Sequence, residues 1–195
     1  MCGRYYLDDE AIREIQGLVG KENIDQNPGG RWDIHPMDLG IVLWREGKHM
    51  EAGWMRWGFP GKQSADLLIN ARAESVSKSS AFRQSFQSRR CILPAAGFYE
   101  WNQRKEKNTF WNPDSPLLYL AGLYDLRENE RRFVVLTTQA NESMRMIHDR
   151  MPLILSKEEI ERWIQDEQAA EELLCKVPSK LKRSQEYEQM NFFDL

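Results

Sequence analysis

The sequence predicts an α+β fold, in which short antiparallel strands form the sheets and a few helices lie at their periphery. Two observations support this fold class. Short strand patterns recur along the chain, whereas amphipathic helical patterns are few. Strands and helices do not alternate regularly, which argues against a βαβ architecture. A chain of 195 residues can bury a substantial core, and it contains no repeat or linker, so we expect one domain over residues 1–195.

The first half of the chain is predicted to begin with a helix, because Asp8 is a suitable N-cap and the apolar residues after it fall on one face. Farther on, Phe82 and Phe86 are spaced to share the buried side of a second helix. The predicted elements in order are a helix over 8–19, a loop over 20–36, a hairpin of 41–44 and 52–57, a loop over 58–67, a helix over 79–89, and strands over 91–94 and 97–101.

The second half is predicted to contain another hairpin, because two apolar runs flank a charged turn. A capping-box pattern at Ser156 to Glu159 then marks the start of an amphipathic helix. The predicted elements in order are a hairpin of 117–123 and 132–137, a short helix over 141–148, a strand over 151–155, a helix from 156 to 164, helical turns over 168–175, and a polar tail over 176–195.

Composition limits the possible functions. The formal net charge is −3, from 27 basic and 30 acidic residues, which excludes coating of nucleic acid by bulk charge but permits a local basic face. No apolar run is long enough for a membrane span, and the N-terminus lacks a secretory signal. Three widely spaced cysteines predict a reducing, cytoplasmic location without a disulfide framework. No residue pattern indicates a metal or a cofactor.

Cys2 directly follows the initiator methionine. If Met1 is removed, Cys2 carries a thiol and a free α-amine on adjacent carbons. The amine has a reference pKa of about 7.7–8.0, so part of it is nucleophilic at neutral pH. Such a 1,2-aminothiol condenses with an aldehyde to an imine, and the thiol then closes a thiazolidine ring. The alternative is that Cys2 is only an early cysteine in a frayed or buried terminus.

Four further motifs follow Cys2 in the chain. With the N-terminal motif they are Met1-Cys2-Gly3-Arg4, Arg56-Trp57-Gly58-Phe59-Pro60, Ile69-Asn70-Ala71-Arg72-Ala73-Glu74, Gly97-Phe98-Tyr99-Glu100-Trp101 and Ile147-His148-Asp149-Arg150-Met151-Pro152. Taken together they resemble the SRAP family, the SOS-response-associated peptidase or abasic-site processing proteins. The resemblance is clear over residues 1–165, and the tail over 176–195 is short and atypical.

The resemblance implies a curled, barrel-like arrangement of mostly antiparallel sheets. It also implies a sensor of abasic sites in single-stranded DNA, acting in the DNA damage response. After Met1 removal, Cys2 would form a covalent thiazolidine crosslink with the ring-opened sugar aldehyde and shield the lesion. Turnover would be limited, no cofactor would be needed, and the protein would act as a monomer without a membrane. Partners among replication proteins stay open.

The implied catalytic set is Cys2, Asn70, Glu100 and His148. Glu100 lies between two aromatic residues, a setting that favours the neutral form of a carboxyl group. The alternative for Glu100 is an outward-facing strand residue. His148 can exchange protons near neutral pH, or it can simply cap a helix. Asn70 would position Cys2 and the opened sugar, or would bond local backbone.

Four residues are candidates for DNA contacts. Arg4, Arg72 and Arg150 carry guanidinium groups that suit phosphate binding, with solvated surface charges as the alternative. Trp57 is expected to stack on a base, with a core position beside Gly58 as the alternative. His35 precedes Pro36 where the family usually has a small residue, so its role stays open.

Two other functions compete with the crosslinking hypothesis. A cysteine peptidase with an N-terminal nucleophile could use the α-amine of Cys2 as the base for its own thiol, and could remove Met1 itself. A non-catalytic nucleic-acid binding module would bind intact and abasic strands equally and with strong salt dependence. The arginines in the motifs favour phosphate over peptide as the ligand.

Overall fold

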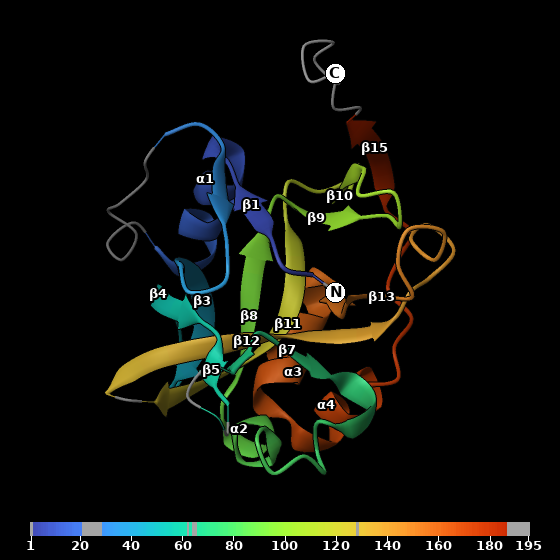
Figure 1. Cartoon of the computed structure of the whole chain (residues 1–195). Helices are drawn as coiled ribbons and strands as arrows, with labels where there is room; N and C mark the ends of the chain where they lie inside the picture. Colours follow the sequence, from blue (N-terminus) through green and yellow to red (C-terminus); the bar gives the residue numbers. More distant parts are fainter. Residues whose placement is uncertain (1, 21–28, 62, 64–65, 128, 187–195) are drawn as a thin grey trace.

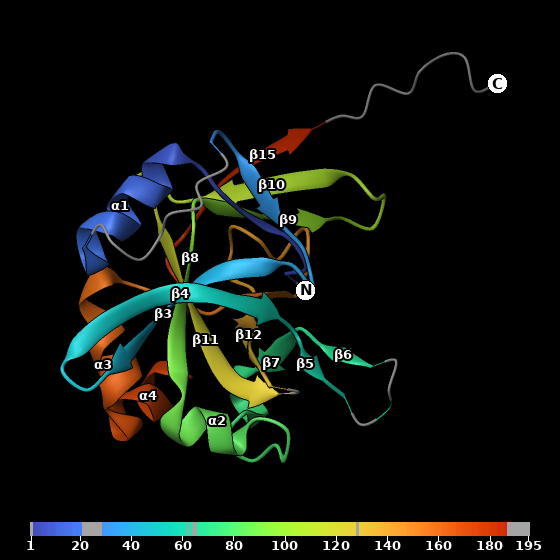
Figure 2. The same cartoon turned by 90° about the vertical axis from the view of Figure 1, so that its left-hand side faces the viewer.

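A closed barrel of five strands forms the centre of the computed structural model, which describes residues 2–20, 29–61, 63, 66–127 and 129–186 (Figures 1 and 2). The ring closes because the last strand pairs with the first, and only the β12–β4 pairing within it is parallel. In order around the ring, the strands are β12 (Glu130–Gln139), β4 (His49–Trp57), β3 (Leu39–Glu46), β8 (Arg90–Ala95) and β11 (Leu118–Arg127). The predicted α+β class and barrel-like sheet are confirmed.

Short strands extend the barrel at its edges. Two of them pair with β12, and these two carry residues of the predicted site. The additional strands are β7 (Asn70–Arg72) and β13 (Arg150–Pro152) on β12, β14 (Ile154–Leu155) on β11, and a separate pair of β5 (Phe59–Pro60) and β6 (Leu67–Leu68). The barrel therefore holds two distant motifs of the sequence on one strand.

A second, five-stranded sheet lies over one end of the barrel (Figure 1). All its pairings are antiparallel, and β1 lies between the edge strand β2 and the central strand β9. Its strands in order are β15 (Lys182–Glu186), β10 (Lys107–Trp111), β9 (Gly97–Trp101), β1 (Tyr5–Leu7) and β2 (Trp32–Ile34). The N-terminal end of β1 thus points towards the space between β9, β7 and β13 (Figures 1 and 2).

The helices are short and peripheral. Asp8 caps α1 through a 2.9 Å hydrogen bond from the Ala11 amide, and Ser156 and Glu159 form the predicted capping box. The helices are α1 (Asp9–Val19), α2 (Arg83–Ser88), α3 (Ile160–Gln165) and α4 (Glu167–Leu173), with 3-10 turns η2 (Ala73–Ser75) and η3 (Lys157–Glu159). None of the helices in the described part of the chain has the length and apolarity needed to cross a membrane.

The buried side chain of Arg90 joins two of these helices to the barrel. It donates hydrogen bonds of 2.7 Å to the Phe86 carbonyl at the end of α2 and 2.6 Å to the Trp163 carbonyl in α3. Carbonyl groups in the last turn of a helix lack intrahelical donors, so one guanidinium satisfies two helix ends. Burial lowers the pKa of Arg90, which remains an ordinary cation.

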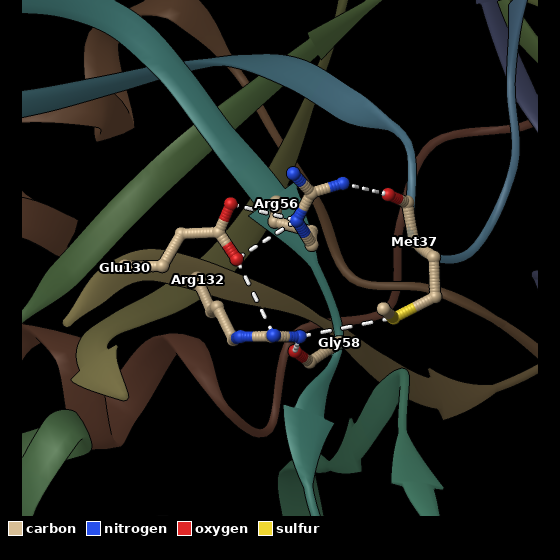
Figure 3. A network of polar contacts seen from close by, with 5 residues as sticks. All are labelled: Met37, Arg56, Gly58, Glu130 and Arg132. Carbon is tan, nitrogen blue, oxygen red and sulfur yellow. Dashed lines mark hydrogen bonds and ion pairs between the residues drawn. The ribbon is translucent and has the colours of Figure 1, made fainter. Parts of the chain in front are cut away.

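A network of charged side chains fixes the loop before β3 (Figure 3). Arg56 on β4 bonds both carboxylate oxygens of Glu130, at 2.7 and 2.8 Å, and also donates 2.6 Å to the Met37 carbonyl. Arg132 on β12 reaches the same carboxylate at 3.3 Å and the Gly58 carbonyl at 3.3 Å. The network ties the loop to the parallel junction of β4 and β12.

The structure corrects several predicted elements. Residues 141–148 form consecutive turns and no helix, because Asn141 Oδ1 accepts from both the amide and the hydroxyl of Ser143 and starts a tight local turn. The strands that were not predicted include β1 before the first helix, β2 and β5 inside the expected loops, β10, and β15 inside the polar tail. Polar strands without apolar alternation carry no pattern signal. Residues 21–28 of the loop and 187–195 of the tail lie outside the described residues.

Candidate active site

Cys2 is fully buried immediately before β1. Its carbonyl accepts a 3.0 Å hydrogen bond from Asn70 Nδ2, although 68 residues separate the two. Burial raises the pKa of the Cys2 thiol far above its usual range, and the negative charge of Glu100 raises it further. The thiol is therefore protonated at neutral pH. The prediction of a frayed terminus does not apply to Cys2, whereas Met1 lies outside the described residues.

Glu100 is brought to Cys2 by the pairing of β1 with β9. Tyr5 pairs with Phe98, and the Tyr99 amide donates to the Arg4 carbonyl at 2.9 Å, so continuation of the register places Glu100 beside the residues before Arg4. Glu100 is 4% exposed and shares a buried face with Phe98. The alternative of an outward-facing Glu100 is wrong. The electrostatic effect of Glu100 on the Cys2 thiol agrees with this proximity.

Asn70 supports the N-terminal segment from the barrel. It begins β7, which pairs in parallel with β12 through Val135. Its bond to the Cys2 carbonyl shows that Asn70 does not serve a local backbone turn. The Oδ1 atom of Asn70 is buried and has no hydrogen-bond donor among the described residues. A buried acceptor of this kind suits a ligand that brings a hydroxyl or an amine.

His148 lies at the end of the 141–148 turn, next to β13. Its Nδ1 atom lies 2.9 Å from the Arg150 amide nitrogen and 2.9 Å from Asp149 Oδ1. An amide can only donate, so the neutral imidazole accepts at Nδ1 and carries its proton on Nε2. A protonated ring can instead donate from Nδ1 to Asp149. His148 is thus held so that both protonation states have a partner, as proton transfer requires.

Arg150 and Arg72 lie on β13 and β7, the two strands on either side of the C-terminal part of β12. Arg150 forms a bidentate pair with Glu74, at 2.6 and 2.9 Å, and donates 2.6 Å to the Thr137 carbonyl. The hydrogen bonds from Arg150 lower the pKa of Glu74. Arg72 is exposed and pairs in register with Thr137, which pairs on its other side with Pro152 of β13, so the two arginines flank β12 on opposite edges. Phosphate binding by these two residues stays a prediction.

Arg4 lies on the opposite face of the five-stranded sheet from Glu100. It forms an ion pair with Asp33, and its guanidinium lies 5.0 Å from the centre of the Tyr99 ring. Burial alone would raise the pKa of Asp33, but hydrogen bonds from Arg4 and Tyr99 outweigh it, and the pKa of Asp33 is lowered. The Arg4 backbone lies at the Cys2 thiol, but its side chain is turned away from the predicted catalytic set towards Asp33. Its phosphate contact also stays a prediction.

Trp57 is a core residue, and its predicted role in base stacking is wrong. It has no exposed surface, donates 2.9 Å to the Ile69 carbonyl, and stacks on Phe133 with ring centres 5.9 Å apart. The turn after it needs glycine, because Gly58 has φ 111° and a Cβ there would lie 2.6 Å from Leu67. His35, whose role the sequence left open, is exposed and contacts Asp38.

Asn108 is the residue of this region that sequence reasoning missed. It is fully buried on β10, directly opposite Glu100. The only sequence signal for Asn108 is its position two residues before Phe110, which places both side chains on the inward-facing side of a strand. This signal can be used only once β10 is known to be a strand. Within the described residues, no group of three or more His, Cys, Asp or Glu side chains is arranged to hold a metal ion.

The buried residues Cys2 and Glu100 and the half-buried Asn70, from three distant motifs, thus meet at the N-terminal segment. The model of one family, SOS response associated peptidase (SRAP), matches residues 1–192. The chain belongs to the SRAP family. The family match extends past residue 165, where the motifs end, and includes β15, so the tail up to residue 186 is an ordinary part of this SRAP domain.

Relatives of this SRAP chain carry a common description. It is 33% identical to abasic site processing protein YoqW of Bacillus subtilis, over 84% of this chain and 80% of that protein. It is 26% identical to abasic site processing protein YedK of Escherichia coli, over 88% and 83%. A solved structure of a protein from Bordetella bronchiseptica matches with a TM-score of 0.79 at 23% identity, over 96% and 100%. This last likeness shows that the fold is shared.

Proposed function

We propose that this protein processes abasic sites in single-stranded DNA by forming a thiazolidine crosslink through Cys2 after removal of Met1. The observation that carries the proposal is the burial of Cys2 between the Asn70 amide and the Glu100 carboxyl group. The names of the relatives, abasic site processing proteins, support the same substrate. A free aminothiol at this place can react with the aldehyde of a ring-opened abasic sugar.

The proposed reaction has two bond-forming stages. The α-amine of Cys2 attacks the aldehyde carbon and gives a carbinolamine, which loses water to become an imine. The sulfur then adds to the imine carbon, and the thiol proton passes to the nitrogen. Aldehyde and aminothiol thus become one thiazolidine and one water molecule, without an oxidant or reductant.

Each neighbouring side chain has a task in this sequence. Glu100, buried on β9, donates a proton to the departing oxygen, and the resulting carboxylate can later take a proton up again. His148, with partners for both protonation states, helps to open the closed sugar ring. Asn70 orients the Cys2 backbone through Nδ2, and its Oδ1 atom can accept a hydrogen bond from a sugar hydroxyl.

The raised pKa of the Cys2 thiol supports this chemistry over that of a cysteine peptidase. A peptidase needs a thiolate, which positive surroundings stabilise, whereas burial and Glu100 both disfavour it here. Ring closure on an imine, in contrast, starts from a neutral thiol and uses its proton. Arg72 and Arg150, on either side of β12, would then hold the phosphates that flank the lesion, without reading sequence.

A denaturing gel tests the proposal. Protein with Met1 removed, confirmed by mass spectrometry, is mixed with single-stranded DNA that contains one abasic site. We expect a heat-stable shifted band for the wild type, none for Cys2→Ser, and none with intact DNA. Cys175→Ser is the matched control, because Cys175 is an exposed thiol and should be dispensable. A band of equal strength from Cys2→Ser, or none from the wild type, contradicts the proposal.

A further inference from the structure

A row of polar side chains crosses three adjacent strands on the buried face of the five-stranded sheet. Glu100 on β9 pairs with Asn108 on β10, and Asn108 pairs with Gln185 on β15. Directly paired side chains of an antiparallel sheet lie on one face, with Cβ atoms about 4.5–5.5 Å apart. Asn108 is 0% exposed and Glu100 is 4% exposed, so both side chains of this pair are shielded from bulk solvent.

The orientation of the Asn108 amide is fixed. Its Nδ2 atom donates a 2.9 Å hydrogen bond to the Glu106 carbonyl, and only the nitrogen end of the amide can face that oxygen. The Oδ1 atom therefore points away from Glu106. It is buried and has no hydrogen-bond donor among the described residues. Gln185, its neighbour on the other side, turns its own amide nitrogen to Glu106 Oε2 at 2.9 Å.

We infer that Asn108 is a positioning residue for Glu100, and that its Oδ1 atom accepts a hydrogen bond from the protonated carboxyl group of Glu100. A buried acceptor without a donor is costly, and a carboxylic acid across the sheet supplies the missing donor. An acceptor favours the acid over the carboxylate, since two oxygen atoms without a proton between them repel each other. Asn108 thereby holds on Glu100 the proton that the departing oxygen takes up during imine formation.

This inference rests on the proposed function and adds a residue to it. Titratable groups on the elements packed around Glu100 are Cys2 before β1, Tyr5 in β1, Glu106 in the β9–β10 hairpin and His148 in the 141–148 turn. Tyr5 shares the buried face with Glu100 because it pairs with Phe98. The turn and the hairpin line a common cavity through Met146 and Glu106. Changes at Asn108 leave these titratable side chains in place but also remove the donor to the Glu106 carbonyl, so a change in the pH dependence is assigned to the side-chain amide of Asn108 as a whole.

The test is the pH profile of the crosslinking rate, measured in single turnover with Met1-processed protein. Asn108→Leu keeps the volume and removes the acceptor, so we expect the alkaline fall of the rate to begin at lower pH, with a rate about threefold to tenfold below wild type on that limb. Asn108→Gln keeps an amide oxygen and should restore most of the profile. Asn108→Val, which suits a strand, replaces the leucine variant if that protein does not fold.

Thr109→Val is the matched control. Thr109 is the next residue on β10 and is 5% exposed, and its hydroxyl oxygen also has no hydrogen-bond partner among the described residues. It pairs with Tyr99 on the opposite face of the sheet. It should leave the pH profile unchanged. Superimposable profiles for wild type and Asn108→Leu, or an equal shift in Thr109→Val, overturn the inference. Absence of crosslinking by the wild type would instead overturn the proposed function, so the two failures are distinguishable.

Discussion

The two faces of the five-stranded sheet carry the same strands but have opposite chemistry. On the buried face, Glu100 and Asn108 lie next to Cys2 without a cation among their direct cross-strand partners. On the other face, Arg4, Arg31 and Lys107 gather around the ring of Tyr99, with side-chain cations 5.0, 5.2 and 4.3 Å from its centre. Strand alternation alone separates the two environments.

One short motif, Tyr99-Glu100-Trp101, can serve two purposes because its side chains alternate between the two faces. A buried carboxyl group can hold and release a proton because water and cations are kept away from it. The guanidinium groups on the other face are weakly hydrated and lie against aromatic rings, and the ammonium of Lys107 is strongly hydrated; all of these cations remain available to a polyanion. Neighbouring residues in Tyr99-Glu100-Trp101 therefore act on different sides of the sheet.

The largest expected effect comes from the buried face. Glu100→Gln keeps the shape of the side chain but cannot act as an acid, and general acid–base groups contribute about 10²–10⁴-fold to rate. We expect crosslinking of abasic DNA to slow by about a hundredfold or more, with binding to intact single strands unchanged. Single-turnover gels and a fluorescence binding assay measure the two quantities. A loss below threefold would remove Glu100 from the mechanism.

Gly97→Ala should disturb both faces together. A Cβ at this position would lie 2.5 Å from the Phe110 carbonyl oxygen and 2.6 Å from the Tyr6 hydroxyl, so β9 must move away from its neighbours. We expect a loss of about 1–3 kcal/mol in the free energy of unfolding, measured by urea denaturation. Gly17→Ala is the control, because it lies in α1 with nothing within 4 Å and should stabilise the protein slightly. Equal stability of both variants would contradict the packing argument.

Asp33→Asn should disturb only the outer face of the five-stranded sheet, which is the face that carries Tyr99. Its carboxylate bonds Arg4 and the Tyr99 hydroxyl, and these bonds lower the pKa of Asp33. A lowered folded pKa adds stability above the unfolded value of about 3.9 and loses it as the pH falls. We expect Asp33→Asn to cost about 1 kcal/mol near neutral pH and little below about pH 3. Thermal denaturation across this range measures it, and a difference independent of pH would reject the ion pair as its cause.

Lys107→Gln should have the smallest effect. Lys107 contacts Tyr99 from a partly exposed position, where a cation–aromatic contact is worth about 0.5–1 kcal/mol. We expect a small loss of stability, an unchanged crosslinking rate at saturating DNA, and a weaker salt dependence of DNA binding if the outer face contacts phosphate. If the salt dependence of DNA binding is unchanged, the cations around Tyr99 contribute to stability and not to DNA binding.

Part of the fold could be predicted from the sequence because its signals are local. The cap of α1 at Asp8, the capping box at Ser156 and the barrel hairpins all follow from short patterns, and the structure confirms them. The strands β10 and β15 could not be predicted, because they are polar and owe their conformation to pairing with a neighbouring strand. Trp57 was misassigned because sequence does not distinguish a buried aromatic ring from an exposed one.

The sequence by itself determined the chemical groups: a cysteine behind Met1, and motifs that supply a carboxyl group, an amide and an imidazole. Only the tertiary structure decided which groups meet. Asn70 reaches Cys2 across 68 residues, Glu100 faces inward, Arg4 faces outward, and Asn108 joins Glu100 from a strand without a pattern. The reason is physical. Reactivity depends on burial and on neighbours across strands, and both are set by long-range pairing that local sequence does not encode.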